Sequence, residues 1–125
     1  MRIGELAART GVSVRSLRYY EEQGLLASTR STSGQRRYAE YAVERVLFVQ
    51  RLYAAGLSSR TIAALLPCVD APSEECSEAA IERMEQERAK LSAHIAELIQ
   101  TRESLDDVLA AGRAALENLR AARRG

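Results

Sequence analysis

The feature that most restricts the fold of this chain is a long heptad pattern in its last third. With Ile81 at position a, the a and d positions run without a slip to residue 119, and nine of these twelve residues are apolar. A stripe of this period and length is typical of a coiled coil. Its apolar members are Ile81, Met84, Leu91, Ile95, Leu98, Leu105, Leu109, Leu116 and Leu119.

A helix over residues 81–119 would be roughly 57 Å long, because an α-helix rises about 1.5 Å per residue. The first 66 residues are too few to bury a stripe of that length and also form a core. The stripe therefore needs a partner helix, and the simplest one is a second copy of the chain in a symmetric dimer. We expect the nine apolar residues to form that dimer interface.

Three positions depart from the heptad pattern. Arg88 and Arg102 occupy a positions, where they could extend to the edge of the interface or pair with an acid across it and fix the register. Gly112 occupies a d position and costs about 1 kcal/mol relative to alanine inside a helix. The pattern leaves open a break at Gly112, with residues 114–122 folded back as a short helix.

The two halves of the chain differ in charge, although the net charge is only +1. Residues 1–66 contain ten Lys/Arg and five Asp/Glu, whereas residues 67–125 contain eight and twelve. A basic half joined to an acidic half indicates that one end binds a polyanion. No segment is apolar enough for a membrane span or an export signal, and two cysteines form no disulfide framework, so we expect a cytoplasmic protein.

The first 66 residues predict a domain of short helices punctuated by glycine. We expect helices over residues 3–9, 14–23 and 39–55, and a fourth from Ser58 that Pro67 closes, with a polar hairpin at 28–38 turning at Gly34. Ser13 and Ser58 suit helix N-caps, and Gly11, Gly24 and Gly56 suit helix ends. In the third helix, Val43, Val46, Leu47, Val49 and Tyr53 share one broad apolar side. Residues 67–76 then form a connector to a helical segment at 77–125.

The second predicted helix, in the segment SVRSLRYYEEQGLL, has two different faces. Arg15, Arg18 and Tyr19 fall within about 100° of arc, whereas Leu17 and Tyr20 point the other way. A short helix and a T-G-V-S turn precede it, which is the layout of a helix-turn-helix with its second helix in the major groove. Arginine can engage guanine edges or clamp a phosphate there.

The polar hairpin adds three more arginines next to this helix, namely Arg30, Arg36 and Arg37. A basic loop beside a recognition helix acts as a wing that contacts phosphates. Each arginine taken alone is also compatible with an ordinary solvated surface. Together they favour a DNA-binding face.

The order and spacing of IGELAARTGVSVRSLRYYEEQGLL, GQRRY and AAGLSSRTIAALL resemble the DNA-binding region of the MerR family of bacterial transcription regulators. The resemblance implies a mainly α fold, with a winged helix-turn-helix domain over residues 1–66 and a long dimerisation helix that forms an antiparallel coiled coil. Such a homodimer would bind a pseudo-palindromic promoter in double-stranded DNA and distort it, acting on RNA polymerase indirectly through the promoter. The chain resembles a short form without a separate effector-binding domain.

The resemblance also implies a set of DNA contacts. The recognition helix contributes Ser13, Val14, Arg15, Arg18 and Tyr19, and the wing contributes Arg36, Arg37 and Tyr38. Ser58, Ser59 and Arg60 lie at a helix N-terminus, where backbone amides can hold a phosphate.

Cys68 and Cys76 are the residues whose chemistry best suits a sensor. Three interpretations stay open: idle thiols among apolar neighbours, a redox-sensitive bridge, or ligation of a metal or other thiol-reactive group. No cysteine follows Cys76, and His94 lies in the middle of the heptads, so a complete four-ligand metal site or an iron–sulfur centre is not expected within one chain. We therefore expect no metal and no cofactor.

Other functions leave part of the sequence unexplained. A coiled-coil interaction module accounts for the heptads but not for the arginine-rich helix and wing. A simple repressor or architectural DNA-binding protein without an inducer fits both. An enzyme is not expected, because the sequence has no nucleophile–base pair, no phosphate-binding glycine loop and no paired carboxylates in a plausible pocket.

Overall fold

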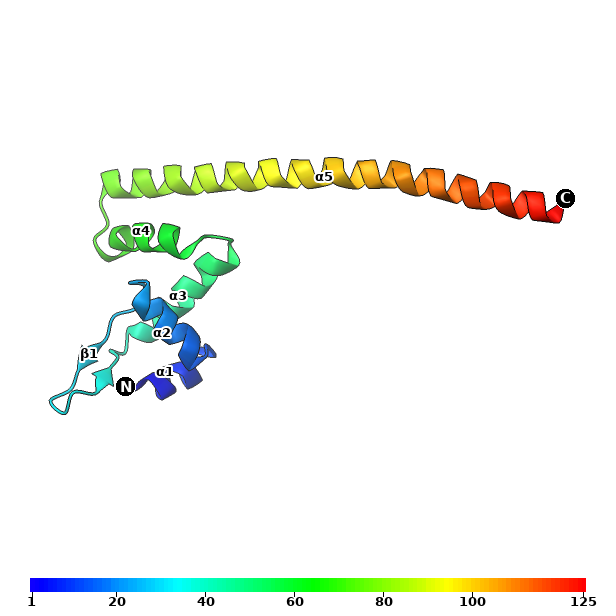
Figure 1. Ribbon diagram of the computed structural model, residues 1–125. Helices are drawn as coiled ribbons and strands as arrows, with labels where there is room; N and C mark the ends of the chain where they lie inside the picture. The colour runs from blue at the N-terminus through cyan, green and yellow to red at the C-terminus, as the bar shows by residue number, and fades with distance from the viewer. The chain divides into compact units, whose positions relative to one another are not determined.

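A computed structural model describes all 125 residues and confirms the expected mainly α fold. The elements, labelled in Figure 1, are α1 (Ile3–Thr10), α2 (Val14–Glu22), β1 (Thr29–Arg30), β2 (Arg36–Arg37), α3 (Ala42–Ala54), α4 (Ser59–Asp70) and α5 (Glu74–Arg124). The chain divides into two compact units, Met1–Ala80 and Ile81–Gly125, which we call the head and the tail. No helix combines the length and the apolar character that crossing a membrane requires.

Local capping explains why the head folds into short helices. The Oγ of Ser13 accepts a hydrogen bond from the amide of Ser16 at 3.1 Å, and the Oγ of Ser58 accepts one from the amide of Thr61 at 3.2 Å. These bonds satisfy amides that a helix start leaves without partners. After α1, Gly11 adopts a left-handed conformation with φ 74°, which glycine reaches without strain. The expected caps are confirmed.

The head has a hydrophobic core of its own. The largest fully buried side chains come from α1, α2, the loop after α2, α3 and α4: Leu6, Leu17, Leu25, Ile62, Val46 and Val49. Leu47 was expected on the buried side of α3 but is 43% exposed. The buried stripe of α3 consists of Ala42, Val46 and Val49, at helical spacings of four and three, and Leu47 lies outside that stripe.

The wing is a two-stranded antiparallel hairpin that pairs Thr29 with Arg37 and Arg30 with Arg36. Gly34 turns it with φ 82°, as expected from the sequence. The base of the hairpin is tied to the chain start: the amine of Met1 donates to the carbonyl of Tyr38 at 2.8 Å, and the amide of Tyr38 donates back to the carbonyl of Met1 at 2.7 Å.

Two predicted helix boundaries in the head are wrong. α3 begins at Ala42 rather than residue 39, because residues 39–42 form a turn closed by the amide of Ala42 and the carbonyl of Ala39. α4 continues through Pro67 to Asp70. Proline removes one helical hydrogen bond, yet the turn that follows is closed by the amide of Ala71 and the carbonyl of Pro67 and held by an ion pair from Arg45 to Asp70. The non-helical part of the predicted connector therefore shrinks to residues 71–73.

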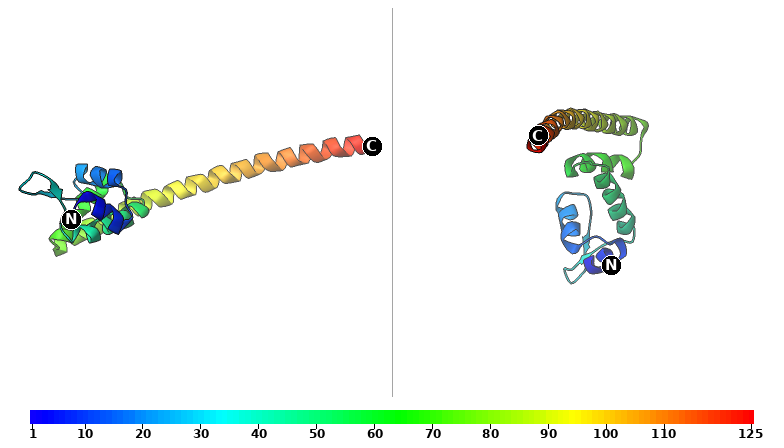
Figure 2. Two further views of the ribbon diagram at one scale, coloured as in Figure 1. Left: turned by 90° about the horizontal axis from the view of Figure 1, so that it is seen from below. Right: turned by 90° about the vertical axis from the view of Figure 1, so that its right-hand side faces the viewer.

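α5 comprises 51 residues, and Figure 2 shows it as one unbroken helix. At about 1.5 Å per residue it is roughly 77 Å long. The break considered at Gly112 does not occur, because one glycine costs too little to interrupt so many consecutive helical turns. None of its residues is buried, and the apolar a and d side chains of the tail are 39% to 70% exposed.

Candidate nucleic-acid interface

Helix α2 separates its apolar and polar side chains as the sequence predicted. Leu17 and Tyr20 are buried, and the ring of Tyr20 stacks on that of Tyr53 with centroids 5.6 Å apart. Arg15, Arg18 and Tyr19 are exposed on the remaining surface. The core contacts thus orient the helix, and its cationic side faces outward.

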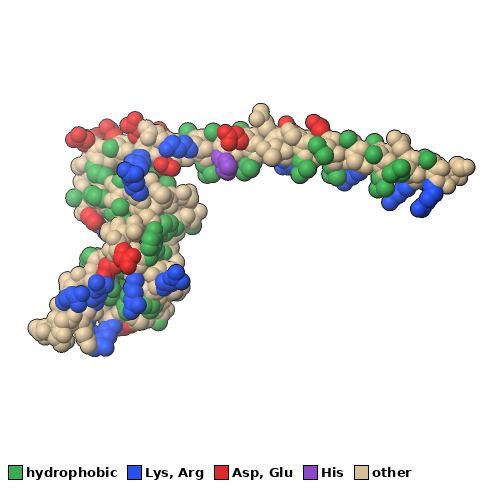
Figure 3. Space-filling model, viewed as in Figure 1, with side chains coloured by type: hydrophobic (Ala, Val, Ile, Leu, Met, Phe, Trp, Pro, Cys, Tyr) green, Lys and Arg blue, Asp and Glu red, His purple; other side chains and the backbone are tan.

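The structure brings Arg18 together with the wing. An open cavity of about 460 Å³ lies between α2, the start of α1 and the hairpin. Four arginines line it, namely Arg2, Arg18, Arg30 and Arg36. Figure 3 shows Lys and Arg side chains gathered over the end of the head that carries these elements. A concave surface with this charge suits the sugar–phosphate backbone of a nucleic acid.

Arg2 also lines this cavity, and it was not predicted from the sequence as a site residue. Its guanidinium donates to Oε1 of Gln35, so it links the residue before α1 to the wing. Arg30 donates to the carbonyl of Gly34 at 2.8 Å and holds the hairpin turn. The only available signal for Arg2 was its basic charge in a basic half, because its approach to the wing depends on the long-range contact between Met1 and Tyr38.

The arginines of the head divide into paired and unpaired groups. Arg36 forms an ion pair with Glu21, and Arg9 forms one with Glu40 at 2.5 Å that lowers the pKa of Glu40. No carboxylate or hydrogen-bond partner engages the five exposed arginines Arg15, Arg18, Arg37, Arg51 and Arg60. An unpaired guanidinium keeps its full donor capacity, so these five are the most available to an anionic ligand.

Tyr38 does not lie where a DNA contact was expected. It is 2% exposed, and its hydroxyl donates to Oε1 of Glu21 at 2.8 Å. Burial raises the pKa of Tyr38, and the hydrogen bond to Glu21 acts in the same direction, so the phenol stays a proton donor. The other carboxylate oxygen of Glu21 binds Arg36. Tyr38 therefore orients Arg36 through Glu21, and we correct its predicted role to that of a core residue.

The start of α4 lies beside α2. The Oγ of Ser59 is 3.0 Å from the hydroxyl of Tyr19 and also hydrogen-bonds the hydroxyl of Tyr53. Ser59 thus holds Tyr19 in place, while Ser58 caps the helix. Arg60 projects into solvent from the same turn. Ser58, Ser59 and Arg60, the three residues expected near a phosphate, thus lie together, and each has a different local role.

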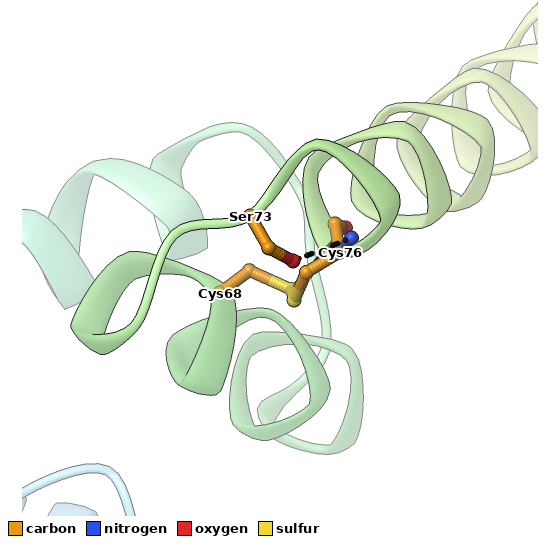
Figure 4. The surroundings of a disulfide bond; sticks show 3 residues. All are labelled: Cys68, Ser73 and Cys76. Atoms are coloured by element: carbon orange, nitrogen blue, oxygen red, sulfur yellow. Dashed lines mark hydrogen bonds between the residues drawn. A yellow bond between two sulfur atoms is a disulfide. The ribbon is translucent and has the colours of Figure 1, made fainter.

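Cys68 and Cys76 form a disulfide with their Cα atoms 5.5 Å apart (Figure 4). The structure therefore differs from the interpretation of two idle thiols. No group of three or more His, Cys, Asp and Glu side chains is arranged to hold a metal ion, and Nδ1 of His94 lies 3.9 Å from Glu97 on the tail surface.

The sequence of this chain matches two protein-family descriptions and resembles known regulators. The family description "MerR HTH family regulatory protein" matches residues 1–67, and "MerR, DNA binding" matches residues 43–108. An HTH-type transcriptional activator SoxR homolog from Chromobacterium violaceum is 37% identical over 117 residues, which cover 92% of this chain and 78% of the relative.

Two solved structures share the fold. The transcription regulator PbrR691 from Ralstonia metallidurans CH34, solved in complex with lead(II), has a TM-score of 0.77 and 32% identity over 86% of this chain and 84% of its own. HiNmlR, a MerR family regulator lacking the sensor domain and bound to promoter DNA, has a TM-score of 0.57 and 25% identity, over 87% of this chain and 86% of its own.

Proposed function

The chain belongs to the MerR family of DNA-binding transcription regulators, and from this premise we propose that it works as a homodimer that distorts promoter DNA. Family membership makes it a regulator rather than an enzyme. The homodimer, the individual DNA contacts and the distortion are the parts that we propose here.

The observation that carries the proposal is the cationic hollow between α2 and the wing. In our proposal α2 enters the major groove with Ser13, Val14, Arg15, Arg18 and Tyr19. Arg36 and Arg37 of the wing, joined by Arg2 and Arg30, contact the flanking phosphates. Arg15, Arg18 and Arg37 support this assignment most strongly, since they have no partner within the chain.

The start of α4 supplies a second phosphate site in this proposal. Its first amides carry the positive end of the helix dipole, and Arg60 adds a charge beside them. Ser59 connects this turn to Tyr19 of the recognition helix. A phosphate bound at α4 and a base step read by α2 would therefore fix one another's position. HiNmlR, a MerR family regulator lacking the sensor domain, is bound to promoter DNA in its structure, which supports promoter DNA as the ligand of this chain.

The exposure of the tail supports the proposed dimer. Side chains such as Leu98, Leu105 and Leu119 are 54%, 64% and 70% exposed, and together with the other apolar a and d residues they form a stripe along the tail. Exposed apolar patches of this extent mark interaction surfaces in soluble proteins. We propose that a second tail covers the stripe in an antiparallel coiled coil.

One antiparallel register uses all twelve core positions. It is symmetric about residue 100 and places each a residue opposite a d residue of the partner, so Ile95 faces the partner's Leu105 and Met84 faces the partner's Leu116. The same register places Arg88 opposite the partner's Gly112. The absence of a side chain there leaves space for the arginine stem to cross the interface and reach solvent. Arg88 and Gly112, two of the three departures from the heptad pattern, thus complement each other.

In our proposal, the DNA is distorted because the dimer couples two heads. Bending a site of 20–30 base pairs costs on the order of 1–6 kcal/mol. Two sets of phosphate contacts can supply that energy, provided that the coiled coil holds the heads at a separation that relaxed DNA does not match. A repressor or an architectural protein would use the same contacts without realigning promoter elements.

The test begins with selection and sequencing of DNA retained by the purified chain. Light scattering gives the mass with and without that DNA, and fluorescence energy transfer across the site gives the bend. We expect a dimer on an inverted repeat, with bent DNA. For Arg37→Ala, we expect the slope of log affinity against log salt to fall by about 0.9 for the lost phosphate contact. Lys90→Ala, on the outer face of the tail, is the charge-matched control. A monomer, or no retained duplex, refutes the proposal.

The register has its own test in a Cys68→Ser, Cys76→Ser background. Leu98→Cys with Arg102→Cys places thiols opposite each other across the dimer axis and should cross-link the two chains on oxidation. Leu91→Cys with Arg102→Cys suits a register shifted by one heptad and should cross-link poorly. The reverse result would contradict symmetry about residue 100.

A further inference from the structure

We propose that Cys68 and Cys76 are a reversible redox site whose oxidation state sets how tightly the chain holds its promoter. The inference rests on the proposed function, because it assigns regulation to the same DNA-binding face. The bond joins the last turn of α4 to the first turn of α5 (Figure 4). Because the bond lies between these two helices, a change in its oxidation state can affect the DNA-binding face through α4.

α4 connects the bridge to the DNA-binding face. Its first turn carries Arg60 and Ser59, and Ser59 hydrogen-bonds Tyr19 of α2. Its last turn carries Cys68, nine residues further along the same helix. A helix transmits a displacement of one end to the other with little loss, because its backbone hydrogen bonds resist bending. A change at Cys68 therefore reaches the candidate phosphate site.

The bridge is the strongest link between α4 and the beginning of α5. The non-helical connector has only residues 71–73, and no ion pair joins α4 to residues 74–80. On the other side of α4, Asp70 is paired with Arg45 of α3, so α4 stays attached to the head when the bridge opens. Reduction would free the first turn of α5 while the core stays intact.

The two sulfurs are accessible and chemically unequal. Both cysteines are half-buried, so small thiols and peroxides can reach them. Cys76 lies in the first turn of α5, where its amide is bound by the Oγ of the capping Ser73 at 3.1 Å. The helix N-terminus favours a thiolate at Cys76 over one at Cys68, which lies near a helix C-terminus. Cys76 is therefore the sulfur that attacks the peroxide on oxidation, and it is the sulfur that leaves as a thiolate on reduction.

The reaction balances with reagents of two ordinary classes. With hydrogen peroxide, the Cys76 thiolate takes one oxygen and becomes a sulfenic acid while hydroxide leaves and is protonated to water. The Cys68 thiol then attacks that sulfur, the S–S bond forms and a second water leaves. A dithiol reductant reverses the change: it attacks Cys68, Cys76 leaves as a thiolate, and the second thiol of the reductant completes its own disulfide.

The first experiment asks whether the bridge is reversible. The full chain is equilibrated with glutathione buffers over a range of reduced-to-oxidised ratios, the free thiols are blocked, and the intact mass is measured. We expect the reduced chain to carry two blocking groups and the oxidised chain to carry none, with the change between them falling within the range of ratios that cells maintain. A bridge that stays closed at every ratio, or a bond between chains on a non-reducing gel, overturns the proposal.

The second experiment compares promoter binding by the two forms. Oxidised and reduced chains are titrated at fixed salt onto the DNA selected as described above. We expect their affinities to differ by at least about fivefold, a usual lower value for coupling between two sites. The cysteine-free variant Cys68→Ser, Cys76→Ser should match the reduced form and ignore peroxide, which also controls for oxidation of the two methionines. Equal affinities overturn the redox site and leave the DNA-binding proposal standing, whereas no binding by either form refutes the latter.

Discussion

The head and the tail are both helical, yet they handle apolar side chains in opposite ways. In the head, Leu6, Leu17 and Val46 are completely buried within one chain. In the tail, the most apolar positions are about half exposed and none is buried. The head therefore buries an apolar core of its own, whereas the apolar residues of the tail would be covered only in the dimer that we propose. The head should thus unfold independently of protein concentration, and the tail should not.

The largest expected effect tests the tail side of this comparison. Ile95→Asp would place a carboxylate opposite the partner's Leu105 in the proposed interface, near its symmetry axis and twice per dimer. We expect the dimer dissociation constant to rise at least a thousandfold, or about 4 kcal/mol, because the unpaired charges must be desolvated. Light scattering measures the mass, and circular dichroism measures the helix lost. Gln100→Asp, on the outer face, is the control and should remain dimeric.

The next effect tests the head. Leu6→Ala leaves a cavity in the core, and we expect it to cost about 3 kcal/mol in the free energy of unfolding of the head. Urea denaturation of this variant and of Leu47→Ala gives a matched pair of leucine truncations, since Leu47 is exposed. Similar losses for both leucines would show that the head does not have the packed core described above.

A smaller effect separates binding from folding. Arg18→Ala removes an exposed guanidinium without a partner, so we expect no change in the denaturation midpoint of the head. The affinity for selected DNA should fall by about 2 kcal/mol, close to thirtyfold, if Arg18 reads a base edge. Fluorescence anisotropy at fixed salt measures it. An affinity equal to that of the unmodified chain would remove Arg18 from the interface.

The smallest effect concerns the link between core and interface. Tyr38→Phe removes the hydrogen bond to Glu21 and should cost about 1.5 kcal/mol at neutral pH. Because the folded state raises the pKa of Tyr38, its stabilisation is complete below the ordinary tyrosine value of 10.0 and is lost as the pH rises through the raised value. The two proteins should therefore converge in stability in strong alkali. A constant difference across that range would contradict the assignment.

Local features of the fold were predictable because they depend on neighbours in sequence. Ser13 and Ser58 cap their helices, and Gly11 and Gly34 turn the chain, as their residue types require. Pro67 was misread because the ion pair and the disulfide that stabilise the following turn involve residues distant in sequence or beyond the helix end. A helix end inferred from one residue fails when tertiary contacts compensate for that residue's cost.

The candidate site was predictable only in part for the same reason. The helical periodicity of α2 correctly separated the exposed Arg15 and Arg18 from the buried Tyr20. The wing has no comparable periodicity, so Tyr38 was indistinguishable from its exposed neighbours, and Arg2 could not be assigned to the hollow. Residues whose place depends on chain segments more than thirty positions apart, such as Met1 and Tyr38, require the fold itself.

The short ladder of the wing has a consequence for how such a regulator could diverge. Only two residue pairs form the strands, and the base is fastened from outside by Met1, so the tip at residues 31–34 contributes nothing to the core. Substitutions at residues 31–33 would leave the core untouched while altering which phosphates the wing contacts in the proposed complex, whereas Gly34 has to keep its positive φ. The wing could thus change how it positions the protein on DNA while the fold of the head stays the same.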